Sequence, residues 1–203
     1  MKTLVIATTN PGKVKEISRL LAGLSLNILS LADFPAIPQV EETGSTFTEN
    51  AIIKARHAAK YTGEMSLADD SGLEVDALDG KPGIQSSRFA GPGATDAQRN
   101  KLLLSLLKDT PDEKRTARFH CVVAIASPSG ETQIFDGVCE GLITREPRGA
   151  HGFGYDPVFF VPEYGKTMAE LPPEVKNEIS HRAKAVKASL CFGSFFGAEA
   201  DSR

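Results

Sequence analysis

Two adjacent carboxylates, Asp69 and Asp70, follow a short apolar segment and precede a Ser-Gly pair, and their residue types suit metal chemistry. Carboxylates at the carboxyl end of a strand in an α/β sheet lie where such folds form ligand crevices. Two neighbouring carboxylates repel each other, and a divalent cation relieves that repulsion. Because Mg²⁺ prefers one or two carboxylates together with substrate phosphates, we predict a Mg²⁺ site here. Glu41 or Glu42 could add an oxygen ligand.

The surrounding stretch, residues 66–83, also allows other interpretations. The spacing of its five carboxylates does not match an EF-hand calcium loop in any register. Asp76 and Asp79 lie just before Gly80, and an Asp-Gly pair favours a turn. For Asp69 and Asp70, a solvated turn remains the alternative to a metal site.

A second polar segment lies between an apolar run and an amphipathic pattern, so it is predicted to join a strand to a helix. Asn10 is a good N-cap residue, and Pro11 suits the first helical position. Backbone N–H groups at a helix start can bind an anion, and Lys13 can reach a phosphate. A well-capped helix with a solvated lysine is the alternative. The candidate phosphate-binding residues are Thr8, Thr9, Asn10, Pro11, Gly12 and Lys13.

The third group combines aromatic and basic residues near the end of the chain. In residues 152–157, GFGYDP, the glycines allow close approach of a ligand, and Phe153 and Tyr155 could stack on a flat ring or pack into the core. Lys176 and residues 180–182, SHR, could donate hydrogen bonds to a keto oxygen or a phosphate. The alternative is a helix capped by the serine, with the arginine in solvent.

Apolar patterns place these candidate residues in an α/β fold. Strands and helices alternate early, and a hairpin is predicted around the turn at residues 128–130, which favours a central mixed sheet flanked by helices, with two lobes and a cleft between them. Residues 1–203 are predicted to form one catalytic unit, with a frayed tail at 192–203. The predicted strands are 3–7, 26–30, 65–68, 118–126, 133–143 and 156–161. The predicted helices run from Pro11 to near Gly23, from a capping box at Thr46 to about Tyr61, and over 96–107 and 180–190.

Composition limits the classes of partner. The chain has 203 residues, 41% apolar and 24% charged, with a formal net charge of −3. This charge argues against broad attraction to nucleic acid or to a membrane surface. No apolar run is long enough to span a bilayer or to form a signal peptide. Cys121, Cys139 and Cys191 form no C-x-x-C pair, and Cys121 and Cys191 have apolar neighbours, so buried free thiols and a cytoplasmic location are predicted.

Taken together, a phosphate-binding helix start, a carboxylate-bound Mg²⁺, an aromatic slot and a cationic donor cluster describe a site for a nucleoside triphosphate. The chain resembles the inosine triphosphate pyrophosphatase family, in particular its bacterial-type hydrolases of non-standard purine nucleoside triphosphates, over roughly residues 3–191. The motifs that carry the resemblance are ATTNPGK (7–13), EETGSTFTENA (41–51), ADDSGLEVDALDGKPG (68–83), TARFHC (116–121), GFGYDP (152–157) and ISHR (179–182).

The resemblance implies Mg²⁺-dependent hydrolysis of inosine, deoxyinosine or xanthosine triphosphate to the monophosphate and pyrophosphate, by a homodimer. It implies that Glu41 and Asp70 bind the metal, that Asp70 also accepts the proton of the attacking water, and that residues 8–13 bind the triphosphate. Asp69 stays a third candidate ligand. The residues implied to hold the nucleotide are Ser71, Phe153, Gly154, Tyr155, Asp156, Lys176, His181 and Arg182. Two rival hypotheses are a phosphohydrolase that releases orthophosphate and a nucleotide sensor without catalytic activity.

Overall fold

The computed structural model describes residues 2–191, and its strands are β1 (Lys2–Ile6), β2 (Leu26–Ser30), β3 (Met65–Val75), β4 (Thr116–Ala126), β5 (Thr132–Ile143), β6 (Phe159–Val161) and β7 (Lys166–Thr167). They form one sheet in the order β2-β1-β3-β4-β5-β6-β7. β1 pairs in parallel with β2 and β3, whereas β6 pairs antiparallel with β5 and β7. The predicted mixed sheet is therefore confirmed. The predicted frayed tail, 192–203, lies outside the described residues.

The helices begin where the polar residues of the sequence indicate. The side chain of Asn10 caps α1 by accepting hydrogen bonds from two backbone N–H groups, and Thr46 caps α2 by accepting one from Glu49. The Glu49 side chain in turn accepts hydrogen bonds from the backbone N–H and the hydroxyl of Ser45, the residue before the cap. The helices are α1 (Pro11–Leu20), α2 (Phe47–Thr62), α3 (Asp96–Leu106), α4 (Pro173–Ile179) and α5 (His181–Leu190).

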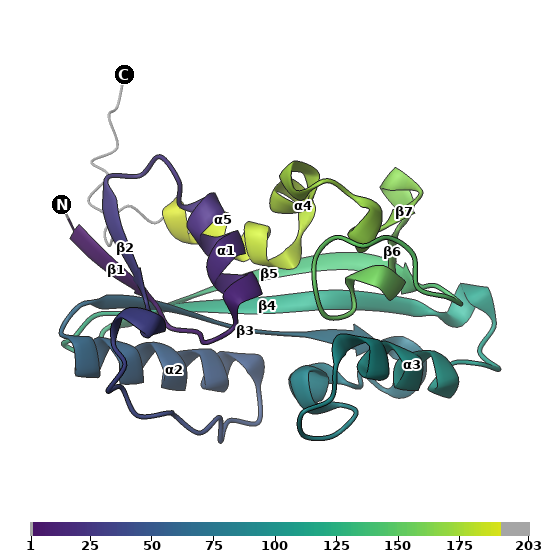
Figure 1. Ribbon diagram of the computed structural model, residues 1–203, viewed down its shortest axis with the longest axis horizontal. Helices are drawn as coiled ribbons and strands as arrows, with labels where there is room; N and C mark the ends of the chain where they lie inside the picture. Colours follow the sequence, from purple (N-terminus) through teal and green to yellow (C-terminus); the bar gives the residue numbers. More distant parts are fainter. Residues whose placement is uncertain (1, 192–203) are drawn as a thin grey trace. The chain divides into compact units, whose positions relative to one another are not determined.

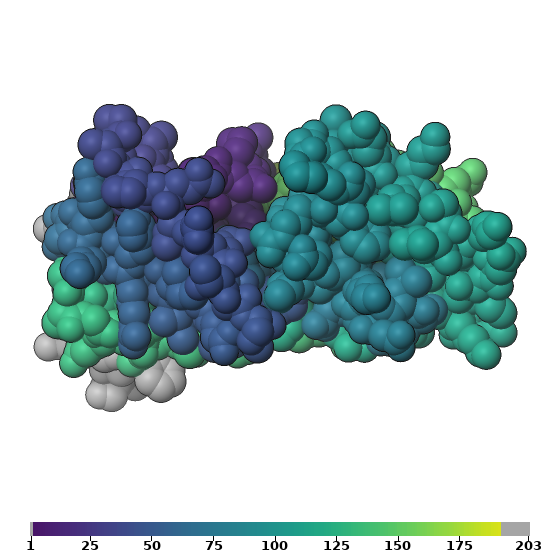
Figure 2. Space-filling model, turned by 90° about the horizontal axis from the view of Figure 1, so that it is seen from below, coloured from purple at the N-terminus to yellow at the C-terminus, as the bar shows by residue number. Residues whose placement is uncertain are grey.

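The chain divides into two compact units. The first comprises the described residues of Met1–Asp70, Cys121–Gly137 and Arg182–Arg203, and the second comprises Ser71–His120 and Val138–His181. In the first unit, α1 and α5 cover one face of the strands and α2 covers the other (Figure 1). In the second unit, α3 lies on one face of the strands and α4 on the other (Figure 1). The outer surfaces of α2, in blue, and α3, in teal, are both visible in Figure 2.

Each unit has its own apolar core. In the first unit, side chains of β1, β3 and β4 pack against α1 and α5, with Ile6, Ile17 and Leu67 fully buried. In the second unit, Leu103 of α3 and Phe159 of β6 are likewise fully buried. This burial of apolar surface is the main favourable term in folding, and it holds the ends of the strands and helices in fixed positions.

The longest departure from the predicted elements is β3. It continues to Val75 instead of ending near Ala68, so Asp69 and Asp70 lie within a strand and not at its carboxyl end. The strand can bury both carboxylates because cationic side chains of the same unit contact them. The predicted turn near Gly80 is confirmed, because Asp76–Leu78 forms a short 3₁₀ helix followed by Asp79 with a positive φ of 53°.

Smaller differences concern short elements and cysteines. The predicted strand at 156–161 begins as a 3₁₀ turn, and α4 was absent from the predicted elements because its seven residues are too few to show a periodic pattern. Cys121 and Cys139 are buried, whereas Cys191 is exposed because it follows the end of α5. Within residues 2–191, each helix is too short or too polar to traverse a bilayer.

Candidate active site

Asp69 lies in the interior of the first unit between two cationic side chains. Its Oδ2 is 2.9 Å from Nζ of Lys13 and accepts hydrogen bonds of 3.1 Å from Nε and Nη2 of Arg182. Only 1% of Asp69 is exposed. Burial alone would raise the pKa of Asp69, but the charges of Lys13 and Arg182 outweigh burial and hold that pKa well below its ordinary value. Asp69 is therefore a carboxylate fixed in its charged form.

Arg182 was predicted to hold the nucleotide, and the structure places its guanidinium against carboxylates of the first unit. Besides Asp69, it contacts Glu16, with Nη1 and Oε2 2.5 Å apart. Arg182 is 2% exposed. Glu16, Arg182, Asp69 and Lys13 thus form a chain of alternating charges that orients the Lys13 ammonium.

Asp70 has a different environment within the same unit. Its Oδ1 is 2.7 Å from Nζ of Lys54, which also lies 2.9 Å from Oε1 of Glu42, and its Oδ2 accepts a longer contact of 3.5 Å from the Asn50 amide. Burial raises the pKa of Asp70 above its ordinary value, and Lys54 offsets only part of that rise. A carboxylate with a raised pKa is a stronger proton acceptor than an ordinary aspartate. These environments favour Asp70 over Asp69 as the candidate general base.

The carboxylates of Glu42 and Asp70 converge on one cation, the Lys54 ammonium. Within residues 2–191, no cluster of three or more His, Cys, Asp or Glu side chains is arranged to hold a metal ion, so Glu41, Asp69 and Asp70 do not assemble as a set. In the described part of the chain, the exposed Glu41 makes no hydrogen bond or ion pair. Because Mg²⁺ needs only one or two carboxylates when phosphates complete its shell, the donor set around Asp70 fits an ion that arrives with a phosphate ligand.

The start of α1 is more fully capped than a free anion site would be. The N–H groups of Gly12 and Lys13 both donate to Oδ1 of Asn10, at 2.9 Å and 3.2 Å, and the Asn10 N–H donates to the hydroxyl of Thr8. Phosphate binding to these amides would have to replace the Asn10 cap. The ammonium of Lys13, whose side chain is 15% exposed, is the stronger candidate for contact with an anion.

In the second unit, the GFGYDP loop surrounds a buried ion pair. Nζ of Lys176 lies 2.5 Å from Oδ2 of Asp156 and 4.9 Å from the centre of the Phe153 ring. Lys176 is 6% exposed and Asp156 is 3% exposed. Gly152 must be a glycine, because it has a φ of +79° and a Cβ there would lie 2.0 Å from the Asp156 carboxylate. The loop is therefore built tightly around the Asp156–Lys176 pair, with Phe153 only partly buried.

Three other predicted residues belong to the second unit: Tyr155, His181 and Ser71. Tyr155 is 4% exposed, belongs to the apolar core and donates its hydroxyl hydrogen to the Ser86 carbonyl, so the core alternative applies to it. Burial raises the pKa of Tyr155 above its ordinary value. His181 stacks on Phe119, with ring centres 4.7 Å apart, and Ser71 lies within β3.

Sequence reasoning missed Lys54 and Asn50 of α2. Asn50 is 1% exposed, and its Oδ1 accepts a hydrogen bond from the Gly44 N–H while its amide faces Asp70. Lys54 stands four residues later and therefore on the same helical face. A polar pair at that spacing, beside the alanines that form the buried face of α2, is the signal that could have identified both residues.

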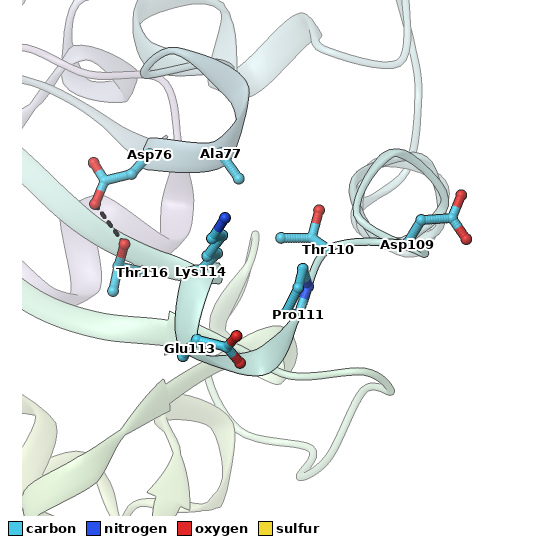
Figure 3. Close-up of a pocket in the computed structure, with 8 residues that line it drawn as sticks. All are labelled: Asp76, Ala77, Asp109, Thr110, Pro111, Glu113, Lys114 and Thr116. Carbon is cyan, nitrogen blue, oxygen red and sulfur yellow. Dashed lines mark hydrogen bonds between the residues drawn. The ribbon is translucent and has the colours of Figure 1, made fainter.

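A surface hollow of the second unit is lined by other residues (Figure 3). It lies around the start of β4, where the Thr116 hydroxyl donates to Asp76 at 2.6 Å. None of the predicted site residues lines it. The lining residues are Asp76, Ala77, Asp109, Thr110, Pro111, Glu113, Lys114 and Thr116.

Known proteins resemble this chain over nearly its whole length. The model of the Ham1 family matches residues 4–191. A dITP/XTP pyrophosphatase of Desulforamulus reducens is 56% identical over 92% of this chain and 93% of its own length, and a dITP/XTP pyrophosphatase of Listeria monocytogenes is 52% identical over 92% of each chain. The structure of a HAM1 protein from Coxiella burnetii superposes with a TM-score of 0.86, at 49% identity, over 95% of this chain and 98% of that one.

Proposed function

The chain belongs to the Ham1 family, and from that premise we propose that it hydrolyses non-standard purine nucleoside triphosphates to the nucleoside monophosphate and pyrophosphate. The observation that carries the proposal is the buried Asp156–Lys176 pair beside Phe153. Lys176 has donor hydrogens to offer a 6-keto oxygen, as in hypoxanthine or xanthine. Adenine carries an amino group at that position and would leave the donor without an acceptor.

In the proposed reaction, a water molecule attacks the α-phosphorus, the bond from that phosphorus to the bridging oxygen breaks, and pyrophosphate leaves. Asp70 accepts the proton of the water as the general base. Lys54 keeps Asp70 oriented and adds positive charge beside it. Lys13 neutralises charge on the phosphates, and the Glu16–Arg182–Asp69 chain holds it in place.

The proposal includes Mg²⁺, held by Asp70 with Glu41 or Glu42. When bound, the ion would neutralise phosphate charge and lower the pKa of a bound water. The proposed metal and phosphate ligands are residues of the first unit. The residues proposed for the base, Phe153, Gly154, Asp156 and Lys176, belong to the second unit. A cytoplasmic location and a homodimer, as the family resemblance implies, complete the proposal.

We expect the purified chain with Mg²⁺ to release pyrophosphate from inosine, deoxyinosine and xanthosine triphosphates. Because a site built to hydrogen-bond a keto oxygen rejects an analogue that lacks it, we expect kcat/KM for adenosine triphosphate to be about 10⁴-fold lower. The measurement is a side-by-side panel with product identification. Release of orthophosphate alone would favour a different phosphohydrolase, and tight binding without turnover would favour a nucleotide sensor.

Substitution of Glu41 and of Glu42 should separate the two candidate metal ligands. We expect Glu42→Gln to raise the Mg²⁺ concentration for half-maximal activity about 10-fold, because Glu42 converges with Asp70 on one cation. Glu41→Gln is the matched variant one residue away. If Glu41→Gln shifts the Mg²⁺ dependence and Glu42→Gln does not, Glu41 is the ligand and Glu42 serves only to hold Lys54.

A further inference from the structure

Helix α3 binds both backbone polar groups of Gly154, in the middle of the GFGYDP loop. The carboxylate of Asp96 accepts a hydrogen bond of 2.7 Å from the Gly154 N–H, and the Asn100 amide donates one of 3.1 Å to the Gly154 carbonyl. Asp96 and Asn100 are four residues apart, so one helical face presents both. A loop glycine with a φ of +66° is thereby fixed to a regular element.

Asn100 is buried, and its contact with Gly154 gives a physical reason for an amide at this position. Asn100 is 4% exposed, and within residues 2–191 its Oδ1 has no hydrogen-bond partner. A buried oxygen without a partner costs stability, and an apolar side chain would avoid that cost. An apolar residue has no N–H group to donate to the Gly154 carbonyl, whereas the Asn100 amide has one.

Asp96 is itself held in place by Arg99. The guanidinium of Arg99 pairs with Asp96 and also donates to the backbone carbonyls of Ser87 and Ala94. The carboxylate that accepts from Gly154 therefore cannot rotate away without breaking an ion pair. The support for the loop is a connected set of contacts within one unit.

The residues on both sides of Gly154 are those that the proposed function needs. Phe153 donates its N–H to Oδ2 of Asp156 at 2.9 Å, and that same oxygen contacts Lys176. If Gly154 moved, the Phe153 ring and the Asp156–Lys176 pair would lose their mutual positions. An error of about 1 Å in such a site can cost roughly 100-fold in activity.

We propose that Asp96 and Asn100 are positioning residues that fix the GFGYDP loop in the conformation that binds the purine base. The inference rests on the proposed function, because that function assigns the base to this loop. It predicts that loss of either side chain weakens recognition of the base and leaves recognition of the phosphates unchanged.

The test measures the Kd of inosine monophosphate and of inorganic tripolyphosphate, which has no base, by calorimetry. For Asn100→Ala and Asp96→Ala we expect the Kd of inosine monophosphate to rise about 10-fold, with the Kd of tripolyphosphate unchanged. Asp96→Asn retains an acceptor for the Gly154 N–H and should restore most of the affinity. Lys101→Ala, at an exposed position of α3, is the control and should match the wild-type chain.

Equal loss of affinity for both ligands, or wild-type affinity for inosine monophosphate in both alanine variants, would overturn the inference. If Asn100→Ala does not fold, the comparison of Asp96→Ala with Asp96→Asn decides, because the Asp96 side chain is 43% exposed. Binding does not require turnover. A wild-type chain that binds inosine monophosphate but does not hydrolyse the triphosphate would refute the proposed function alone, and one that neither binds the monophosphate nor hydrolyses the triphosphate would refute both.

Discussion

Asp70→Asn is expected to lower kcat by about 10²–10⁴-fold while the protein remains folded. Asparagine has nearly the same shape as aspartate but cannot accept the proton of the attacking water. The fold should survive because Lys54, the cationic partner of Asp70, keeps its contact with Glu42. Asp70→Asn should therefore lower turnover without lowering the stability of the fold.

The measurement is kcat for inosine triphosphate at saturating Mg²⁺, together with the melting temperature. Asp109→Asn is a suitable control because the Asp109 side chain is 89% exposed. Near-normal turnover in Asp70→Asn would remove Asp70 as the base. Asp69 would be a poor replacement, because its lowered pKa makes it a weak proton acceptor.

Much of the fold could be predicted because its signals are local. Asn10 and Thr46 start their helices as the sequence indicates, and the apolar run 26–30 is a strand with those same bounds. Elements that depend on distant contacts could not be predicted. β3 carries two adjacent aspartates through a buried strand because Lys13, Lys54 and Arg182 neutralise them, and Arg182 lies more than a hundred residues away in the chain.

In the candidate site, too, the features with local signals could be predicted and those that depend on distant contacts could not. Residue types made Asp70, Lys13 and Lys176 candidates, because their chemistry is visible in the sequence, but the pairing of Lys176 with Asp156 was not predicted. The different partners of Asp69 and Asp70 could not be predicted from their spacing, because neighbouring residues in a strand point to opposite faces and meet side chains that lie far away in the chain. The contact of Lys54 with Asp70 could not be predicted, because it forms only when α2 packs beside β3.

Asp69→Asn is expected to destabilise the protein by about 3–5 kcal/mol, a much larger loss of stability than Asp70→Asn should cause. The substitution removes the charge that faces Arg182 and Lys13, and Arg182 is 2% exposed. A buried cation that loses a carboxylate partner retains its desolvation cost. Urea unfolding of the wild-type chain and the variant gives the difference, and Asp76→Asn is the matched surface control. Asp76 pairs with Arg118 at an exposed site, so its substitution should cost less than about 1 kcal/mol.

The pH dependence of that difference provides an independent check on the role of Asp69. The pKa of Asp69 is lower in the folded chain than its ordinary value of 3.8, so its charge contributes stability that is fully present above that value. As the pH falls below 3.8 toward the lowered pKa, this contribution is lost from the wild-type chain, whereas Asp69→Asn has none to lose. The difference in free energy of unfolding should therefore be constant near neutral pH and should shrink in acid. If Asp69→Asn lowers the free energy of unfolding only slightly at neutral pH, Asp69 is not needed to stabilise the buried charges of Arg182 and Lys13. The proposal that the Glu16–Arg182–Asp69 chain holds Lys13 in place would then fail.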